Sequence, residues 1–307
     1  MDIVTGGLGF IGNELVRQLL AKGRSVAIID NENRLASQLE DLNEVPRYTI
    51  DITDAQAVDE VMGKLKPERV FHLAAIHYIP ECNAQPERTV RINTEGTLSV
   101  LNAAIKHHCK HFIFASTGAV YYDSPLALTE ASPIAPVDIY GWSKWFAEEI
   151  CRWKAPTIPI TICRLFNNIG LRETNPHIVP EIIQQLKTGS RVLQLGNTTP
   201  IRDYISTQDT ASALIRLSEL KPDVCEVYNV ATGKGASVNE LIHCLSTLLK
   251  EEIAVQADPA RFRAADKAVQ LADITKLKSK LNWEPQQHMK DVLSVILKFE
   301  GLMPHEA

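Results

Sequence analysis

Tyr140 and Lys144 are the two residues of this chain whose types and spacing most directly suggest chemistry. They lie four positions apart, in Ile139-Tyr140-Gly141-Trp142-Ser143-Lys144. The residues that follow predict a helix, in which the two side chains would lie one turn apart on the same face. A tyrosine normally titrates near pH ~10, and a neighbouring ammonium lowers its pKa by favouring the phenolate. The pair therefore predicts a tyrosine that accepts and returns a proton.

A glycine-rich segment near the start of the chain is typical of a dinucleotide site. Gly6, Gly9 and Gly12 lie between a predicted strand and a predicted helix. Glycines let the backbone approach a pyrophosphate, whose charge the helix N-terminus meets, although such turns also occur for steric reasons. Asp30 ends the next predicted strand and suits a ribose diol; a solvated turn residue is the alternative. A carboxylate there would repel a 2'-phosphate, which favours NAD over NADP, whereas the nearby Arg34 argues the other way.

Strands and helices alternate along the first half of the chain in an order that can position these residues. Apolar segments at 2–5, 25–30, 48–51, 69–73, 112–115 and 160–163 predict strands, and segments 8–20, 54–65, 86–106 and the tyrosine segment predict helices. Apolar strands joined through helices indicate an α/β fold with a parallel sheet covered on both faces.

The chain changes character after residue 165. Connections rich in Asn, Pro and Gly follow, and the apolar segment 227–230 predicts one more strand of the main sheet. We therefore expect residues 1–165, with returning segments near 203–231, to form the dinucleotide-binding domain. Residues 166–202 and 232–307 are expected to form a smaller substrate lobe.

Composition excludes several other classes of protein. The chain has 307 residues, 45% of them hydrophobic, and a formal net charge of -5 without a Lys/Arg cluster, which argues against a nucleic-acid partner. No apolar run has membrane-spanning length and no secretory signal is evident, so a cytoplasmic location is expected. The six cysteines are scattered, and the segment 107–111, rich in histidine, follows a predicted helix, so no metal site is expected.

The chain resembles the extended short-chain dehydrogenase/reductase family, the NAD-dependent epimerases and dehydratases that act on nucleotide sugars. The motifs that carry the resemblance are Thr5 to Gly12, Asp30, Asp51-Ile52, His72-Leu73-Ala74-Ala75, Asn93 to Thr97, Ser116 to Tyr121, Tyr140 to Lys144, Arg164 to Asn167, Arg202-Asp203-Tyr204 and Arg263 to Asp266. They occur in the family's order over nearly the whole length. The resemblance implies a Rossmann-type doubly wound sheet and a C-terminal α/β lobe.

The same resemblance implies roles for individual residues. Thr117 would complete a catalytic group with Tyr140 and Lys144 by hydrogen-bonding the same substrate oxygen as the tyrosine. The implied cofactor-binding residues are Gly6, Gly9, Phe10, Ile11, Gly12, Asp30, Asn31, Asp51, Ile52, Leu73, Ala74, Ala75, Asn93, Ser116, Tyr140 and Lys144. The implied substrate-binding residues are His77, Thr117, Asn167, Arg202 and Arg263, although His77 is equally consistent with an exposed loop position. Arginine suits a nucleotide diphosphate through its forked geometry.

The function that these motifs favour is a nucleotide-sugar 4-epimerase of carbohydrate biosynthesis, acting on a UDP-sugar through a transient 4-keto intermediate with bound NAD. An NAD(P)H-dependent 4-keto-6-deoxysugar reductase is the alternative, which Phe166-Asn167-Asn168 resembles. A 4,6-dehydratase is disfavoured because Gly118 and Ala119 offer no acid or base where that class carries an acidic pair. A non-catalytic dinucleotide sensor is disfavoured because the Tyr-Lys pair is retained.

The tyrosine helix also predicts a partner. At ~100° per residue, Trp142, Phe146, Ile150 and Trp153 form an aromatic and apolar stripe apart from the face that carries Tyr140. In a monomer this stripe would be exposed to water. We expect a homodimer formed through the helices around 86–106 and 139–153.

Overall fold

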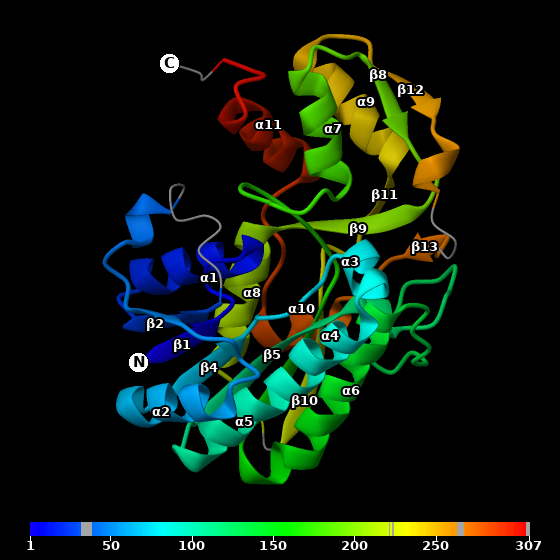
Figure 1. Ribbon diagram of the computed structural model, residues 1–307. Helices are drawn as coiled ribbons and strands as arrows, with labels where there is room; N and C mark the ends of the chain where they lie inside the picture. Colours follow the sequence, from blue (N-terminus) through cyan, green and yellow to red (C-terminus); the bar gives the residue numbers. More distant parts are fainter. Residues whose placement is uncertain (32–38, 221, 223, 263–266, 305–307) are drawn as a thin grey trace.

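A parallel sheet of seven strands forms the centre of the structure, a computed structural model that describes residues 1–31, 39–220, 222, 224–262 and 267–304. Its strands are β1 (Asp2–Thr5), β2 (Val26–Asp30), β3 (Arg47–Thr49), β4 (Arg69–His72), β5 (His111–Thr117), β6 (Ile160–Leu165) and β10 (Cys225–Val230). They lie side by side in the order β10-β6-β5-β4-β1-β2-β3 (Figure 1). The chain proceeds from β1 to one side and from β4 to the other, so a crevice opens at the carboxyl ends of these two strands.

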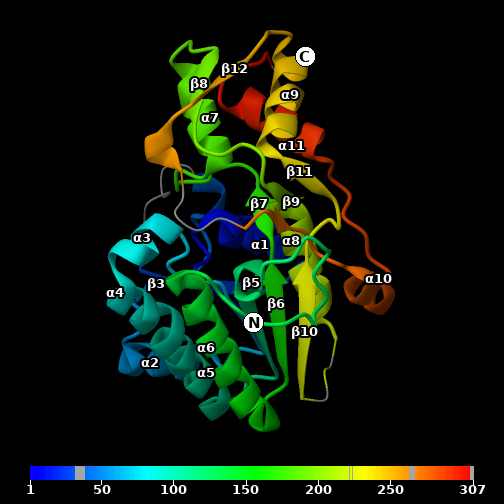
Figure 2. The same ribbon diagram turned by 90° about the vertical axis from the view of Figure 1, so that its right-hand side faces the viewer.

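Helices cover both faces of the sheet because its strands are apolar on both sides. The helices α1 (Phe10–Ala21) and α8 (Thr207–Ser218) pack together on one face, and α2 (Ala55–Leu65), α5 (Gly96–Lys106) and α6 (Ile139–Lys154) cover the other (Figure 2). Each face has its own buried cluster, the first including Leu15 and Leu214 and the second including Val100 and Ala147. We call the sheet with these helices the large domain.

A second lobe lies above the large domain in Figure 1. Its strand β9 (Ile201–Ser206) pairs with β7 (Asn167–Ile169), β11 (Gly235–Ser237) and β13 (Val269–Gln270), while β8 (Val192–Leu195) pairs with β12 (Ala254–Ala257). The helices α7 (Ile178–Lys187), α9 (Val238–Leu249) and α11 (Met289–Phe299) bury their apolar faces against one another and these strands. This cluster gives the lobe a core of its own.

The predicted fold class is confirmed, with differences in three elements. The helix expected over 86–106 is divided into α4 (Pro86–Val90), a π-helical turn (Arg91–Glu95) and α5. Before it, the structure adds the short helix α3 (Ile79–Ala84), which was not among the predicted helices. Late in the chain, α10 (Thr275–Leu281) packs beside β10 and buries Leu277 in the core of the large domain, not in the second lobe.

No helix within the described ranges is both long enough and apolar enough to cross a membrane.

Candidate active site

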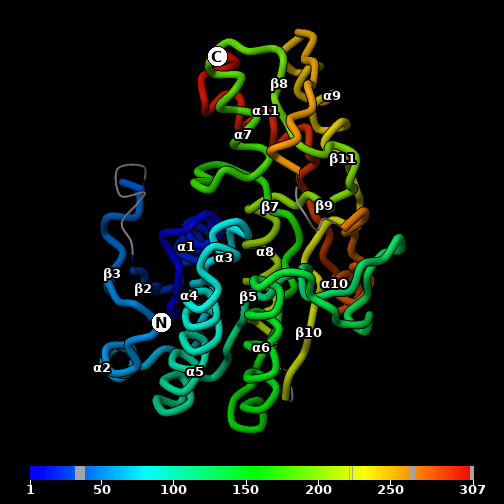
Figure 3. The backbone as a smooth tube through the Cα atoms, turned by 45° about the vertical axis from the view of Figure 1, so that its right-hand side comes forward, coloured from blue at the N-terminus to red at the C-terminus, as the bar shows by residue number. Residues whose placement is uncertain are grey.

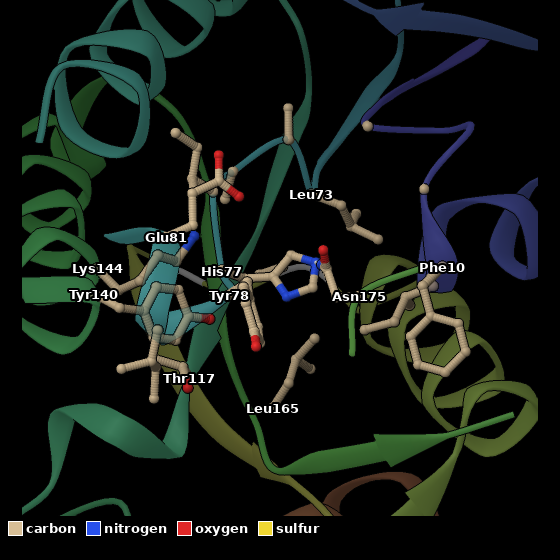
Figure 4. A pocket seen from close by; sticks show the side chains of 18 of the residues that line it. Phe10, Leu73, His77, Tyr78, Glu81, Thr117, Tyr140, Lys144, Leu165 and Asn175 are labelled. Carbon is tan, nitrogen blue, oxygen red and sulfur yellow. The ribbon is translucent and has the colours of Figure 1, made fainter. Parts of the chain in front are cut away.

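A cleft of about 700 Å³ opens at the carboxyl ends of the sheet strands and is lined by both the large domain and the second lobe. Its walls include the glycine-rich segment, the residues after β4, the end of β5, the start of α6 and the segment after β7. Figure 4 shows Thr117, Tyr140 and Lys144 gathered at one side of this cleft and Phe10 at the other. The crevice is therefore where an open parallel α/β sheet binds its ligands.

The glycine-rich segment is shaped as a cradle for a phosphate. Gly6 has a φ of +69°, and a Cβ added there would meet the backbone nitrogen of Ala74 at 2.7 Å. A Cβ at Gly12 would lie 2.0 Å from the carbonyl oxygen of Gly6. Both positions thus exclude side chains, and the amino end of α1, which begins after Gly9, faces the cleft without an acidic residue in its first turn. Free amides and a positive helix end suit a pyrophosphate.

Acidic side chains line the same end of the cleft. Asp30, at the end of β2, accepts a hydrogen bond from the backbone of Leu8 at 2.9 Å, and Asn31 lies beside it. Asp51 accepts two hydrogen bonds from Thr53, at 2.9 Å from the backbone nitrogen and 2.8 Å from the hydroxyl. These contacts fix both carboxylates at the wall, so the residues present fit the ribose and base of a dinucleotide.

Tyr140 and Lys144 begin α6, whose start is fixed by local hydrogen bonds. The Asp138 carboxylate caps the helix by accepting a hydrogen bond from Gly141 at 2.7 Å. Thr117 ends β5, and its hydroxyl accepts from the backbone nitrogen of Ala119 at 3.1 Å. Two elements distant in sequence thereby bring the predicted tyrosine, lysine and threonine together (Figure 4).

The electrostatics of this group differ from the sequence-based expectation. Burial raises the pKa of Tyr140 above its ordinary value, whereas the Thr117 hydroxyl lowers it. Burial also lowers the pKa of Lys144 to about 7, and its ammonium lies 4.1 Å from the centre of the Phe114 ring. The sequence predicted a lowered tyrosine pKa, whereas the pKa is raised, because burial disfavours the charged form of the phenol.

Asn93 supports the site from behind. Its side chain exchanges two hydrogen bonds with the backbone of Ile76, each 2.8 Å, and donates to the Ser143 hydroxyl at 2.9 Å. It is buried in the π-helical turn and does not line the cleft. A π turn can re-aim one side chain of a helix toward a functional site. Asn93 therefore joins the segment after β4 to α6.

Most of the other residues expected at the site lie on its walls. Those that line the cleft are Gly6, Gly9, Phe10, Ile11, Gly12, Ile52, Leu73, Ala74, Ala75, Ser116, His77, Asn167 and Arg202. Arg34 and Arg263 lie outside the described residues. The Nε2 atom of His77 accepts a hydrogen bond from the side-chain amide nitrogen of Asn175 of the second lobe at 3.2 Å, and burial lowers the pKa of His77. His77 is thus part of a contact between the two walls (Figure 4).

Several polar residues of the cleft were missed by sequence reasoning. Asn175, Glu173 and His177 follow β7, and Lys267 precedes β13. Glu173 lies 3.4 Å from the His177 ring, and burial raises its pKa to about 8. The only sequence signal for this segment was its polar composition after residue 165, which does not say which side chains turn inward.

The sequence and the structure were compared with those of known proteins. A family model described as GDP-mannose 4,6 dehydratase matches residues 3–296. The chain is 30% identical to UDP-glucose 4-epimerase 2 of Arabidopsis thaliana, over 94% of this chain and 92% of that protein. Among solved structures it resembles UDP-glucose 4-epimerase of Thermotoga maritima with UDP-glucose, with a TM-score of 0.88, 28% identity, and coverage of 97% and 98%. It also resembles UDP-glucose 4-epimerase of Bifidobacterium longum in complex with NAD+ and UDP, with a TM-score of 0.89, 27% identity, and coverage of 99% and 98%.

Proposed function

Because the chain belongs to the GDP-mannose 4,6 dehydratase family of extended short-chain dehydrogenases/reductases, we propose that it is an NAD-dependent 4-epimerase of a UDP-sugar. The observation that supports this most is the cleft itself. It has Tyr140, Lys144 and Thr117 at one side and the phosphate cradle at the amino end of α1 at the other. The relatives named for 4-epimerases and the neighbour with bound NAD+ and UDP agree with this arrangement.

The residues of the cleft divide into those that would hold the cofactor and those that would hold the substrate. The backbone from Gly9 to Gly12 would bind the pyrophosphate of NAD, and Asp30 would bind a ribose diol. When bound, NAD supplies an acceptor and donor of hydride. Asn167 and Arg202 would grip the nucleotide diphosphate, since arginine binds phosphate bidentately.

The side chains at the other side of the cleft would transfer the proton of the sugar 4-hydroxyl. Tyr140, as phenolate, takes the proton from the sugar 4-hydroxyl as C4 is oxidised to a ketone. Thr117 hydrogen-bonds the same oxygen, and the Lys144 ammonium compensates the phenolate charge. The 4-keto sugar then turns over in the cleft, and Tyr140 returns the proton when C4 is reduced from the other face. Lys144, only 2% exposed, is shielded from water during this exchange.

The packing at Gly118 argues against a 4,6-dehydratase. A Cβ at this position would lie 3.0 to 3.1 Å from the Phe166 ring, so an acidic side chain there would require this ring to shift. The next residue, Ala119, lines the cleft without a group that can move a proton. Elimination across C5 and C6 needs such a group, whereas epimerisation at C4 does not.

The decisive experiment supplies UDP-glucose or UDP-galactose to the purified protein without added reductant and follows the appearance of the other sugar. We expect interconversion, and Tyr140→Phe should lower kcat by about 10²- to 10⁴-fold because it removes the proton acceptor. Nucleotide released on denaturation should be NAD.

Two results would reject this function. Consumption of NADH or NADPH in proportion to product would identify the 4-ketosugar reductase instead. Unchanged turnover in Tyr140→Phe would remove the phenolate from the mechanism. Ser132→Ala, a change on an exposed turn outside the cleft, is a control expected to leave kcat unchanged.

We also propose that the protein is a homodimer formed through the helices around 86–106 and 139–153. Within these ranges, α5 and α6 run side by side in Figures 2 and 3. Trp142, Phe146 and Trp153 of α6 are 42%, 43% and 68% exposed, and the first two rings lie 5.7 Å apart. A row of large exposed aromatic residues favours an interface between copies.

A further inference from the structure

Lys267 is a buried lysine of the second lobe that reaches the catalytic side of the cleft. It comes just before β13, its relative exposure is 7%, and it lines the cleft together with Thr117 and Tyr140. Its ammonium donates hydrogen bonds to the carbonyl oxygen of Ala119, at 3.2 Å, and to that of Tyr121. These two carbonyls flank the end of the short 3-10 turn that follows Thr117. A side chain of one lobe thus fixes the backbone of the other.

The turn that Lys267 holds contacts the two elements that carry the hydroxyl groups of Thr117 and Tyr140. The Thr117 hydroxyl caps the turn by accepting from Ala119. On its other side, the Ala119 carbonyl oxygen would lie 3.0 Å from a Cβ at Gly141, so the first turn of α6 packs directly onto it. Ala119 therefore lies between the threonine and the helix that carries Tyr140. A shift of this carbonyl would change the distance between the two hydroxyl groups.

The charge of Lys267 also bears on the tyrosine. Burial lowers the pKa of Lys267, while Asp138 and Asp123 favour its charged form and Arg202 opposes it. Asp138 caps α6, and its charge helps raise the pKa of Tyr140, as Cys82 also does. A cation near Asp138 offsets the effect of that carboxylate on the phenol. Removing the cation would leave a less compensated negative charge beside the catalytic base.

We propose that Lys267 is a positioning residue for epimerisation: it holds the turn after Thr117 against α6, so that Thr117 and Tyr140 meet the same sugar oxygen. The proposal rests on the function proposed above. Two of the three ammonium donors of Lys267 are used by the carbonyl oxygens. The residue acts through the turn, and not as an acid or base.

The test compares Lys267→Met, which keeps the length and removes the charge and donors, with Lys267→Arg, which keeps both. Lys276→Met is the matched control, because Lys276 also donates to a backbone carbonyl, that of Val227 at 2.9 Å, but lies on α10 away from the cleft. We expect Lys267→Met to lower kcat by about 10²-fold with little change in KM, as a displacement of about 1 Å does. The kcat of Lys267→Met should also reach its maximum at a higher pH than that of wild type. Lys267→Arg should restore most of the wild-type kcat and most of the wild-type pH profile.

A second measurement does not depend on activity. Amide hydrogen exchange of the peptide spanning residues 117–122 should be faster in Lys267→Met than in wild type or Lys276→Met, because the turn loses two hydrogen bonds. Unchanged exchange there, or unchanged kcat and pH profile with only a lower Tm, would overturn the positioning role. If wild type shows no epimerase activity but the exchange difference is present, the proposed function fails and the role in holding the turn stands.

Discussion

At the scale of single residues, Glu173 is a carboxyl group that the fold keeps protonated near neutral pH. Its side chain is 6% exposed at the cleft wall, and burial raises its pKa from 4.5 to about 8. The His177 ring at 3.4 Å does not reverse this effect. The folded protein therefore binds a proton here that the unfolded chain releases near pH 4.5.

The substitution Glu173→Gln tests whether proton binding at Glu173 makes the stability of the protein depend on pH. A raised carboxyl pKa confers stability that is complete below the unfolded pKa and is lost as pH rises through the folded pKa. The free energy of unfolding of wild type, relative to Glu173→Gln, should therefore fall between about pH 5 and pH 8, by up to about 1.4 kcal/mol per unit of pKa difference. Urea denaturation at several pH values measures it. Parallel curves for the two proteins would mean that Glu173 titrates normally.

The residues that sequence predicted and those that it missed differ in how they reach the cleft. Tyr140 and Lys144 depend on one helix, and the glycine loop depends on one strand-to-helix turn, so local spacing was enough to find them. Lys267 and Glu173 reach the same cleft only because distant segments of the second lobe fold over it. No short-range pattern encodes that approach. The raised pKa of Tyr140 was also unforeseen, because burial depends on the whole cavity.

At the scale of elements, the glycines that flank α1 distinguish two energetic costs of replacing glycine. One comes from the backbone conformation and the other from crowding of the added side chain. Gly6 has a φ of +69° and a crowded Cβ position, 2.7 Å from Ala74, whereas Gly23, with a φ of +72° after α1, has open space around it. Both prefer glycine for their backbone conformation. Only at Gly6 does the absence of a side chain also allow close packing, in this case against Ala74.

Gly6→Ala and Gly23→Ala should therefore differ in stability and in cofactor content. The conformational cost alone is about 1 kcal/mol, and crowding adds about 1–3 kcal/mol at Gly6. We expect Gly6→Ala to lose its bound nucleotide and Gly23→Ala to retain it. Urea denaturation and the nucleotide released from each purified variant provide the measurements. Equal losses in the two variants would show that contact with Ala74 is unimportant.

Elements of the large domain were predictable because their strands are short apolar runs between helices, as in β5 and β6, which are buried throughout. In the second lobe, β12 is exposed along its whole length and β8 buries only alternate residues, so neither is buried throughout as β5 and β6 are. The π-helical turn between α4 and α5 was missed, because the sequence predicted one continuous helix over 86–106. Its role is visible only once Asn93 meets Ile76.

At the scale of the whole molecule, the exposed aromatic residues of α6 predict the oligomeric state. We expect sedimentation of wild type at micromolar concentration to give twice the monomer mass, and Trp142→Glu combined with Phe146→Glu to give monomers, since charges disfavour an apolar interface. Val295→Glu, at a position 44% exposed on α11 of the second lobe, is the control and should remain dimeric. A monomeric wild type would contradict the proposed dimer.

The chain passes repeatedly between the large domain and the second lobe. After β6 it enters the lobe, returns for α8 and β10, enters it again from β11 to β13, returns for α10, and ends in α11. A single junction in the gene therefore cannot exchange one complete lobe for that of a relative, because any one junction divides at least one of the two lobes. Descendants of this protein would acquire a new sugar preference by substitutions within the existing framework, and not by shuffling of modules.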